Sequence, residues 1–343
     1  MKILITGASG FIGSFLCEEG AKAGHSVWAG MRASSSRKWL EGAGVEFQTL
    51  DLTNRDSLRS QLHAARAAMG GWDVIVHAAG ATKCIDAADF DRNNYDCTVN
   101  LVETLRELDM VPRLFVYVSS LSVLGPIRES DYSEMCADDE PRPNTAYGRS
   151  KVRSEAYLKQ LGTDVLPYVI FRPTGVYGPR EKDYFLMAKS ICQHVDFAVG
   201  YKPQQITFVY VLDLVGAIYA AIGKVEKDDT EAMMGQIFHV SDGQSYSSRA
   251  FSDYIQEDLG VRGVLHIKAP LWFLRLVCAV SEFFARSAHK VTTLNGDKYN
   301  IMSQRNWNCD ITPMRQILGY EPKWPLERGT KETMAWYKSQ KWL

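Results

Sequence analysis

Ile3-Leu4-Ile5-Thr6-Gly7-Ala8-Ser9-Gly10-Phe11-Ile12-Gly13 is the stretch that decides the fold of this chain. A short apolar run leads into three glycines, with two other residues between each glycine and the next, and a helical pattern follows at once. Such glycines permit a tight turn, a close approach of backbone to pyrophosphate, and packing of the helix on the strand. The helix N-terminus offers unpaired N–H groups to the phosphates. Glycines also punctuate ordinary turns, but this position predicts a dinucleotide site. Its candidate contacts are Gly7, Gly10, Phe11, Ile12 and Gly13.

Strand and helix patterns alternate up to about residue 172, which is typical of a parallel sheet covered by helices on both faces. The predicted strands are Lys2–Thr6, Ser26–Met31, Val45–Leu50, Val74–His77, Leu114–Ser119 and Val165–Arg172. The predicted helices are Phe11–Ala23, Asp86–Leu108 and Tyr147–Leu161. We therefore expect an α/β fold with a Rossmann-type, doubly wound parallel sheet.

The pattern loosens after Gly178, although Ile206–Leu212 and Gln236–Val240 still look like strands. We expect a dinucleotide-binding domain over residues 1–178 and a smaller, mixed α/β substrate lobe over residues 179–343. The two are interleaved, because strands from about residues 206–240 are expected to return to the first domain.

Composition and residue spacing give no indication of a nucleic-acid partner, a disulfide framework, a metal site or a signal peptide. Lys and Arg total 39 and Asp and Glu total 40, so charge gives no argument for a nucleic-acid partner. The seven cysteines lack a Cys-x-x-Cys pair and the seven histidines lack ligand spacing, so we expect neither a disulfide framework nor a metal site. The first strand begins at Lys2, which leaves no room for a signal peptide. Reduced thiols and a cytoplasmic location are the expectation.

The segment after the second predicted strand indicates which dinucleotide binds. It reads Gly30-Met31-Arg32 and carries no carboxylate for a ribose 2′-hydroxyl, whereas a cation there suits a 2′-phosphate. A guanidinium pairs with phosphate through forked hydrogen bonds. We therefore predict NADP rather than NAD, bound by Arg32 and Arg37, with a solvated basic loop as the alternative.

Tyr147 and Lys151 stand four residues apart in a predicted helix and so share one face. A tyrosine normally titrates near 10, and a neighbouring ammonium favours its phenolate. At about 4 Å and an effective dielectric near 20 the pairing could contribute up to ~4 kcal/mol, before desolvation is subtracted. The pair predicts proton transfer to or from a substrate oxygen, with Tyr147 as acid and base and Lys151 lowering its pKa.

The chain resembles the extended short-chain dehydrogenase/reductases, also called the NAD-dependent epimerase/dehydratase family. The matching motifs are Thr6–Gly13, Asp51-Leu52, His77–Gly80, Val118–Ser120, Tyr147–Lys151, Arg172–Pro179 and Phe208–Asp213. The resemblance implies that Asp51 and Leu52 border the adenine, Ala78 and Ala79 the inner ribose and phosphates, and Pro173 the nicotinamide, while Lys151 also bonds the nicotinamide ribose.

The same resemblance, through the spacing to Gly125, selects Ser120 as the hydroxyl that completes the catalytic set with Tyr147 and Lys151. Ser122 is then expected to line the pocket. The further candidates for substrate contact are Gly175, Tyr177 and Lys83, the last with a solvated loop lysine as its alternative.

Members acting on nucleotide-diphosphate sugars usually carry an Asn where this chain has Gly175 and an Arg where it has Ile206. Neither residue can hold a diphosphate, so the resemblance leans towards dihydroflavonol reductase and 3β-hydroxysteroid dehydrogenase-like branches. We expect hydride transfer between NADP and an alcohol or ketone of a fairly apolar small molecule, in a homodimer. A nucleotide-sugar epimerase or dehydratase and a non-catalytic NADP-binding regulator are the alternatives.

The apolar run Leu271–Ala285 contains Arg275 and Glu282 and is shorter than the roughly 20 residues that a spanning helix needs. As a helix it would carry an apolar stripe. That stripe could roof an apolar pocket, pack on the protein's own core or on a dimer mate, or touch a membrane surface, the last being disfavoured. Its members are Phe273, Leu276, Val277, Val280 and Phe284.

Overall fold

The computed structural model describes residues 1–288, 292 and 294–343, and its described residues form a seven-stranded parallel sheet. The strand order is β11-β6-β5-β4-β1-β2-β3. The strands are β1 Lys2–Thr6, β2 Ser26–Met31, β3 Glu46–Thr49, β4 Val74–His77, β5 Leu114–Val118, β6 Tyr168–Pro173 and β11 Ile237–Val240. This sheet confirms the predicted doubly wound α/β fold.

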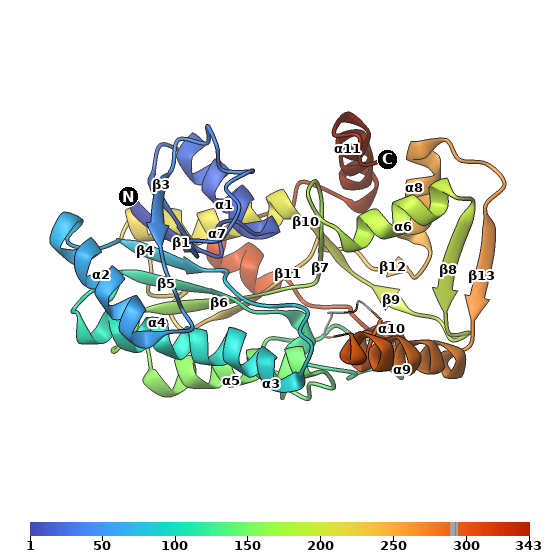
Figure 1. Ribbon diagram of the computed structural model, residues 1–343, viewed down its shortest axis with the longest axis horizontal. Coiled ribbons are helices and arrows are strands. Elements are labelled where there is room, and N and C mark those ends of the chain that lie inside the picture. Colours follow the sequence, from blue (N-terminus) through green and yellow to red (C-terminus); the bar gives the residue numbers. More distant parts are fainter. Residues whose placement is uncertain (289–291, 293) are drawn as a thin grey trace.

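Helices cover both faces of this sheet (Figure 1). On one face α1 packs on α7, and on the other α2, α4 and α5 lie side by side. The helices are α1 Phe11–Lys22, α2 Arg55–Met69, α3 Ala87–Phe90, α4 Cys97–Glu107, α5 Ala146–Leu161 and α7 Val211–Glu226. Strands β4, β5 and β6 are buried on both faces, because helices cover the sheet on both sides.

The strand order reverses at β1, which pairs with β2 on one side and with β4 on the other. In open parallel sheets, ligands bind at the carboxyl ends of the strands beside such a reversal. The first glycine turn leaves β1 at this point. We therefore expect the ligand site at the carboxyl ends of β1, β2, β4 and β5.

Two elements of the structure differ in detail from the predicted ones. The predicted helix Asp86–Leu108 is interrupted by a π-helical turn at Asp91–Asp96, between α3 and α4. The predicted strand Ile206–Leu212 ends early, because α7 begins at Val211 and buries Asp213 in its first turn. The Asp213 carboxylate accepts the backbone N–H groups of Lys323 and Trp324, which binds a C-terminal loop to this helix.

The later part of the chain builds a smaller lobe around aromatic side chains, including Tyr177, Phe208 and Phe251. Its strands form pairs: β7 Gly175–Tyr177 with β10 Phe208–Tyr210, β9 Gln205–Ile206 with β12 Tyr246–Ser247, and β8 Val195–Val199 with β13 Leu265–Ala269. Its helices are α6 Asp183–Cys192, α8 Ala250–Leu259, α9 Leu271–Ser287, α10 Gly296–Ser303 and α11 Leu326–Ser339. Short turns of 3₁₀ and π helix occur at Leu121–Val123 and Met314–Leu318.

A buried ion pair joins strand β6 to helix α5. Arg172 on β6 is 0% exposed and Glu155 on α5 is 2% exposed. The guanidinium donates from Nε and Nη2 to the two carboxylate oxygens, at 3.0 and 2.6 Å, and the Ser119 hydroxyl donates to the same carboxylate at 2.6 Å. These bonds satisfy charges that would otherwise be costly to bury.

We expect Glu155→Gln to lower the free energy of unfolding by about 3–5 kcal/mol, because it leaves a buried guanidinium without its counter-charge. The exposed pair Arg142–Glu140 provides the matched control, and Glu140→Gln should cost under about 1 kcal/mol. Urea unfolding followed by circular dichroism measures both. Equal effects of the two substitutions would contradict the assignment.

Candidate functional site

The glycine turn brings three stretches of backbone into close contact. Gly7 adopts a φ of +71°, its carbonyl oxygen accepts the Gly10 N–H at 2.9 Å, and a Cβ on it would lie 2.7 Å from the Cα of Ala79. A Cβ on Gly13 would collide with the Gly7 carbonyl. Helix α1 therefore begins at Phe11, after a four-residue turn that follows β1. No side chain of the described residues caps its N-terminus, which leaves its first N–H groups available to an anion.

A cavity of about 740 Å³ opens at this turn and runs along the sheet edge. Thirteen predicted site residues line it: Gly7, Gly10, Phe11, Ile12, Gly13, Arg32, Leu52, Ala78, Ala79, Ser120, Tyr147, Lys151 and Pro173. An uncapped helix N-terminus, a glycine cradle and a bordering cation fit the phosphates of a dinucleotide.

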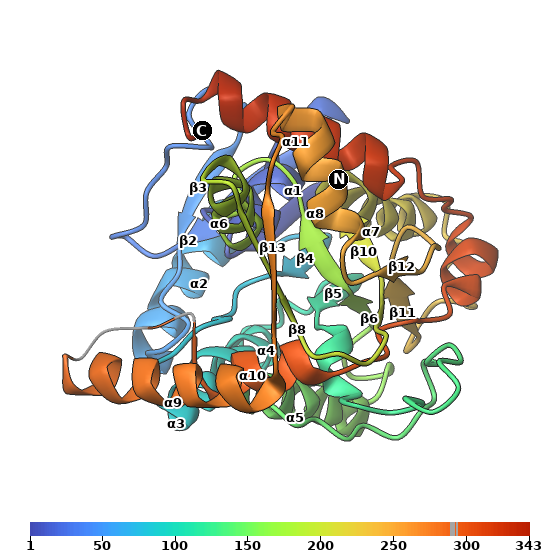
Figure 2. The same ribbon diagram turned by 90° about the vertical axis from the view of Figure 1, so that its right-hand side faces the viewer.

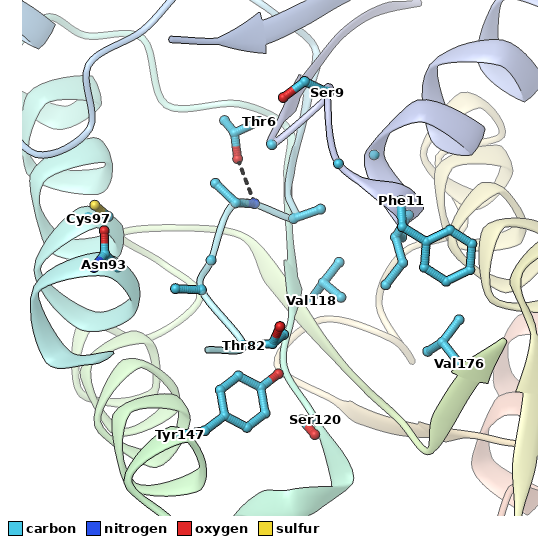
Figure 3. Close-up of a pocket in the computed structure, with 18 of the residues that line it drawn as sticks. Thr6, Ser9, Phe11, Thr82, Asn93, Cys97, Val118, Ser120, Tyr147 and Val176 are labelled. Atoms are coloured by element: carbon cyan, nitrogen blue, oxygen red, sulfur yellow. Dashed lines mark hydrogen bonds between the residues drawn. The ribbon is translucent and has the colours of Figure 1, made fainter. Parts of the chain in front are cut away.

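Buried hydroxyls hold the wall formed by residues 78–81. The Thr6 hydroxyl lies 2.7 Å from His77 Nδ1 and accepts the Ala79 N–H at 3.3 Å, the bond drawn in Figure 3. The other ring nitrogen of His77 lies 3.1 Å from the Thr98 hydroxyl. Burial lowers the pKa of His77 to about 3, so the ring is neutral and serves this network rather than proton transfer.

The two predicted phosphate-binding arginines lie in different places. Arg32 lines the cavity together with Ser35, but the guanidinium of Arg37 lies 4.3 Å from the centre of the Phe47 ring and Arg37 is outside the cavity lining. Asp51 also lies outside the lining, and its carboxylate accepts the Thr53 hydroxyl at 2.7 Å, whereas Leu52 and Thr53 border the cavity.

Tyr147, Lys151 and Ser120 meet at the other end of the cavity. Thr145 caps α5 by accepting the Gly148 N–H, so the helix begins immediately before Tyr147. Figure 3 shows the phenol of Tyr147 between Thr82 and Ser120. The Lys151 ammonium donates to the Val118 carbonyl at 2.8 Å and lies 4.8 Å from the centre of the Tyr117 ring.

Burial is the largest cause of the pKa shifts of Tyr147 and Lys151. It raises the pKa of Tyr147 to about 12, against a smaller opposing effect of a hydrogen bond with Ser120. It also lowers the pKa of Lys151 to about 8, against the attraction of Glu155. The expected lowering of the Tyr147 pKa by Lys151 is therefore wrong for this structure, because loss of hydration disfavours the phenolate more than its neighbours favour it. Near neutral pH the phenol holds its proton.

The sequence reasoning missed Asn94, whose side chain supports the wall of the cavity. It is 1% exposed in the π-helical turn, where its side chain accepts the Ala81 N–H at 2.7 Å and donates to the Ser150 hydroxyl at 2.8 Å. It thereby joins the wall of the cavity to helix α5. Such turns frequently occur at functional sites, and the adjacent Asn93 does line the cavity.

Asp297 of α10 was also missed. Its carboxylate accepts the N–H groups of Ala146 and Tyr147 at 3.0 and 3.2 Å, and Asn300 donates to the Asn144 carbonyl at 2.7 Å. The next residue, Lys298, lines the cavity. Helix α10 thus satisfies two backbone donors at the start of the helix that carries Tyr147.

The predicted substrate contacts lie outside the cavity lining. Tyr177 is fully buried in the aromatic cluster of the second lobe, and Gly175 lies against the Tyr184 hydroxyl. Lys83 forms an ion pair with Asp183, and the Ser122 hydroxyl accepts from Ser120 at 3.1 Å. The residues that do line this end, besides Asn93 and Lys298, are Thr82, Thr174, Val176, Glu181, Asp183, Tyr184 and Met187.

Comparison with known proteins agrees with this geometry. Residues 3–238 match the model of the NAD dependent epimerase/dehydratase family. Curated relatives include an uncharacterized UDP-glucose epimerase of Bacillus subtilis, 26% identical over 99% of this chain and 98% of that protein. Another is a sterol-4-alpha-carboxylate 3-dehydrogenase of Candida albicans, 23% identical over 97% of each chain.

Solved structures share the fold. The dTDP-glucose 4,6-dehydratase of Bacillus anthracis, in complex with NAD, superposes with a TM-score of 0.76 at 19% identity, over 99% of this chain and 97% of that one. The similarity spans both lobes.

We expect Asp297→Ala to lower the free energy of unfolding by about 1–2 kcal/mol, because the N–H groups of Ala146 and Tyr147 lose their acceptor. Amide hydrogen exchange at these two positions should accelerate more than exchange at the buried strand β5. Asp297→Asn keeps one acceptor oxygen and should give a smaller effect on both measurements. Unchanged exchange at Ala146 and Tyr147 in the alanine variant would contradict the contact.

Proposed function

Because the chain belongs to the NAD-dependent epimerase/dehydratase family, a family of enzymes, we propose that it is an NADP-dependent oxidoreductase acting on an alcohol or ketone of a fairly apolar small molecule. The observation that carries the proposal is the convergence of Ser120, Tyr147 and Lys151 on the cavity that begins at the glycine turn. The lining of that cavity of about 740 Å³ extends from the glycine turn to Tyr184 and Met187 of α6, which supports a dinucleotide and a substrate bound in the same cavity.

The residues present suggest how a nicotinamide cofactor is held. The glycine turn and the start of α1 would bind the pyrophosphate, Arg32 the adenosine end, and Pro173 the nicotinamide side. The nicotinamide, when bound, supplies or accepts a hydride.

Tyr147 would exchange the proton that accompanies the hydride. Since burial raises its pKa to about 12, the phenol is protonated near neutral pH and can donate to a carbonyl oxygen. Ser120 would donate a hydrogen bond to the same oxygen as charge develops on it. Lys151 keeps a positive charge close to the proton donor below its pKa of about 8.

The substrate end lacks the two groups that hold a diphosphate in many relatives. A Cβ at Gly175 would lie 2.5 Å from the Tyr184 hydroxyl, so the ring of Tyr184 takes the space that an asparagine would need. Ile206 packs against the aromatic cluster. Met187, Val176 and Tyr184 add apolar surface to the lining, which suits a substrate with an apolar body.

A nucleotide-sugar epimerase or dehydratase is the second candidate. Lys298 lines the cavity and offers a cation to an anionic substrate. Curated relatives of this chain carry the names of sugar-nucleotide epimerases as well as sterol dehydrogenases. Net consumption of NADPH separates the candidates, because an epimerase returns its cofactor to the starting state in each turnover.

We expect the wild-type protein to consume NADPH with apolar ketones in a substrate panel, and Tyr147→Phe to lower kcat/KM by about 10²–10⁴-fold through loss of the proton donor. Tyr157 lies on the same helix and donates to Glu103, away from the cavity lining, so Tyr157→Phe is the matched control. Wild-type turnover in Tyr147→Phe would refute the acid role. Conversion of nucleotide sugars without net NADPH loss would favour the second candidate.

We expect kcat/KM for carbonyl reduction to fall as pH rises through about 8, because Lys151 then loses its proton and its charge. A guanidinium stays protonated far above this pH, so Lys151→Arg should move the fall to higher pH. A profile that is flat from neutral pH to pH 9 would contradict the role of the ammonium.

Arg32→Ala should raise the Kd for NADPH by about tenfold to a hundredfold and leave the Kd for NADH nearly unchanged, because only NADPH presents a 2′-phosphate. Arg37→Ala is the control, since its guanidinium lies over Phe47. Isothermal titration calorimetry measures both. An unchanged preference in Arg32→Ala would overturn the assignment of NADP to this residue.

A further inference from the structure

Helix α9 presents an apolar face to solvent. Leu274 and Cys278, 7% and 1% exposed, are turned towards the protein, where α9 packs on α10. The other side of the helix carries large apolar side chains that are 46–69% exposed. These six residues define the α9 face: Trp272, Phe273, Leu276, Val280, Phe283 and Phe284.

The exposure of these side chains decides between some of the roles expected for the apolar stripe of Leu271–Ala285. Phe273, Leu276, Val280 and Phe284 point away from the core of the described chain, so packing of this stripe on the protein's own core is wrong. Among the described residues that line the cavity, none belongs to the α9 face, so the stripe does not roof that cavity.

The apolar surface continues on the strand that precedes α9. Phe197 of β8 pairs with Ile267 of β13, and Phe197, Leu265 and Ile267 are 60%, 62% and 37% exposed. Only Pro270 separates β13 from α9. Figure 2 shows β13 and α9 on the side of the molecule that faces the viewer. An exposed apolar area of this extent is unusual unless it binds something.

Basic residues outnumber acidic ones along the chain that carries the α9 face. The chain from Gly260 to Phe284 contains Arg262, Lys268 and Arg275 and one carboxylate, Glu282, which accepts the Gly296 N–H. All three cationic residues are exposed. A surface that combines aromatic side chains with basic ones complements an anionic lipid bilayer, in which the rings enter the headgroup region and the cations meet the lipid phosphates.

We propose that the α9 face binds the surface of an anionic lipid bilayer, with α9 lying in the plane of the interface. No helix among the described residues is long and apolar enough to cross a bilayer, so the expected attachment is to one surface only. A second copy of this chain fits less well. A two-fold interface would bring the arginine and lysine side chains of both copies together with one carboxylate from each stretch, Glu282, which already accepts the Gly296 N–H.

Such binding would place lipid on the side of α9 that is turned away from α10 and the cavity. Helix α10, against which α9 packs, contributes Lys298 to the cavity and Asp297 to the start of α5. The proposal does not rest on the proposed reaction, because binding to vesicles requires neither cofactor nor turnover.

Vesicle flotation of the full chain tests the proposal. We expect the protein to float with vesicles of phosphatidylcholine and phosphatidylglycerol, and more weakly with phosphatidylcholine alone. Trp272→Ser/Phe283→Ser should weaken binding to the anionic vesicles by about tenfold or more, because both side chains lose the apolar surface that would enter the lipid. The control Val111→Ser/Val165→Ser changes two exposed apolar residues before β5 and β6, distant in sequence from α9, and should bind as wild type does.

Arg275→Gln should weaken binding to the anionic vesicles severalfold. Arg59→Gln on α2, an exposed arginine far from α9, should not. Thermal unfolding of each variant checks that the fold is retained. Absence of flotation with both lipid compositions overturns the proposal, as does equal binding by the Trp272→Ser/Phe283→Ser variant. If sedimentation velocity instead shows a wild-type dimer that this variant dissociates, without flotation, a second copy covers the α9 face and the proposal is wrong.

Discussion

The close approach of backbone at Gly7 to backbone at Ala79 is the contact on which the rest of the site depends. A single added Cβ would lie 2.7 Å from the Cα of Ala79, and one at Gly13 would strike the Gly7 carbonyl. Since backbone cannot yield as a flexible side chain can, either substitution would push α1 away from the carboxyl ends of β1 and β4. The uncapped N-terminus of α1 would then no longer face the cavity, and its first N–H groups would no longer be available to an anion there.

Around this contact, buried polar groups are joined in pairs that leave few charges unsatisfied. His77 bridges Thr6 and Thr98, Asn94 connects the wall at Ala81 to Ser150, and Arg172 shares the Glu155 carboxylate with Ser119. Each bond links an element that carries cavity residues to its neighbour. Because unpaired polar groups are costly in a low-dielectric interior, these links hold the cavity walls in one arrangement. The same low dielectric holds the proton on Tyr147 and loosens it on Lys151.

The second lobe does more than cover the cavity. Its aromatic cluster takes up Tyr177 and places Tyr184 against Gly175, which removes the space for a polar side chain at that point. Its α10 helix caps the start of α5 through Asp297. The start of the helix that carries Tyr147 and the exposed α9 face are therefore connected through one pair of packed helices, α9 and α10.

The amino-acid sequence by itself determined the doubly wound sheet, the glycine turn and the shared helical face of Tyr147 and Lys151, because these follow from periodicities and turn preferences of residues close in the chain. It also selected Arg32, which follows β2 directly. Only the tertiary structure decided that Arg37 lies over Phe47, that Tyr177 is buried, that Asp297 caps a helix 150 residues away, and that the stripe of α9 faces outward. No local pattern encodes these contacts, since each depends on which distant segment the folded chain brings against the side chain.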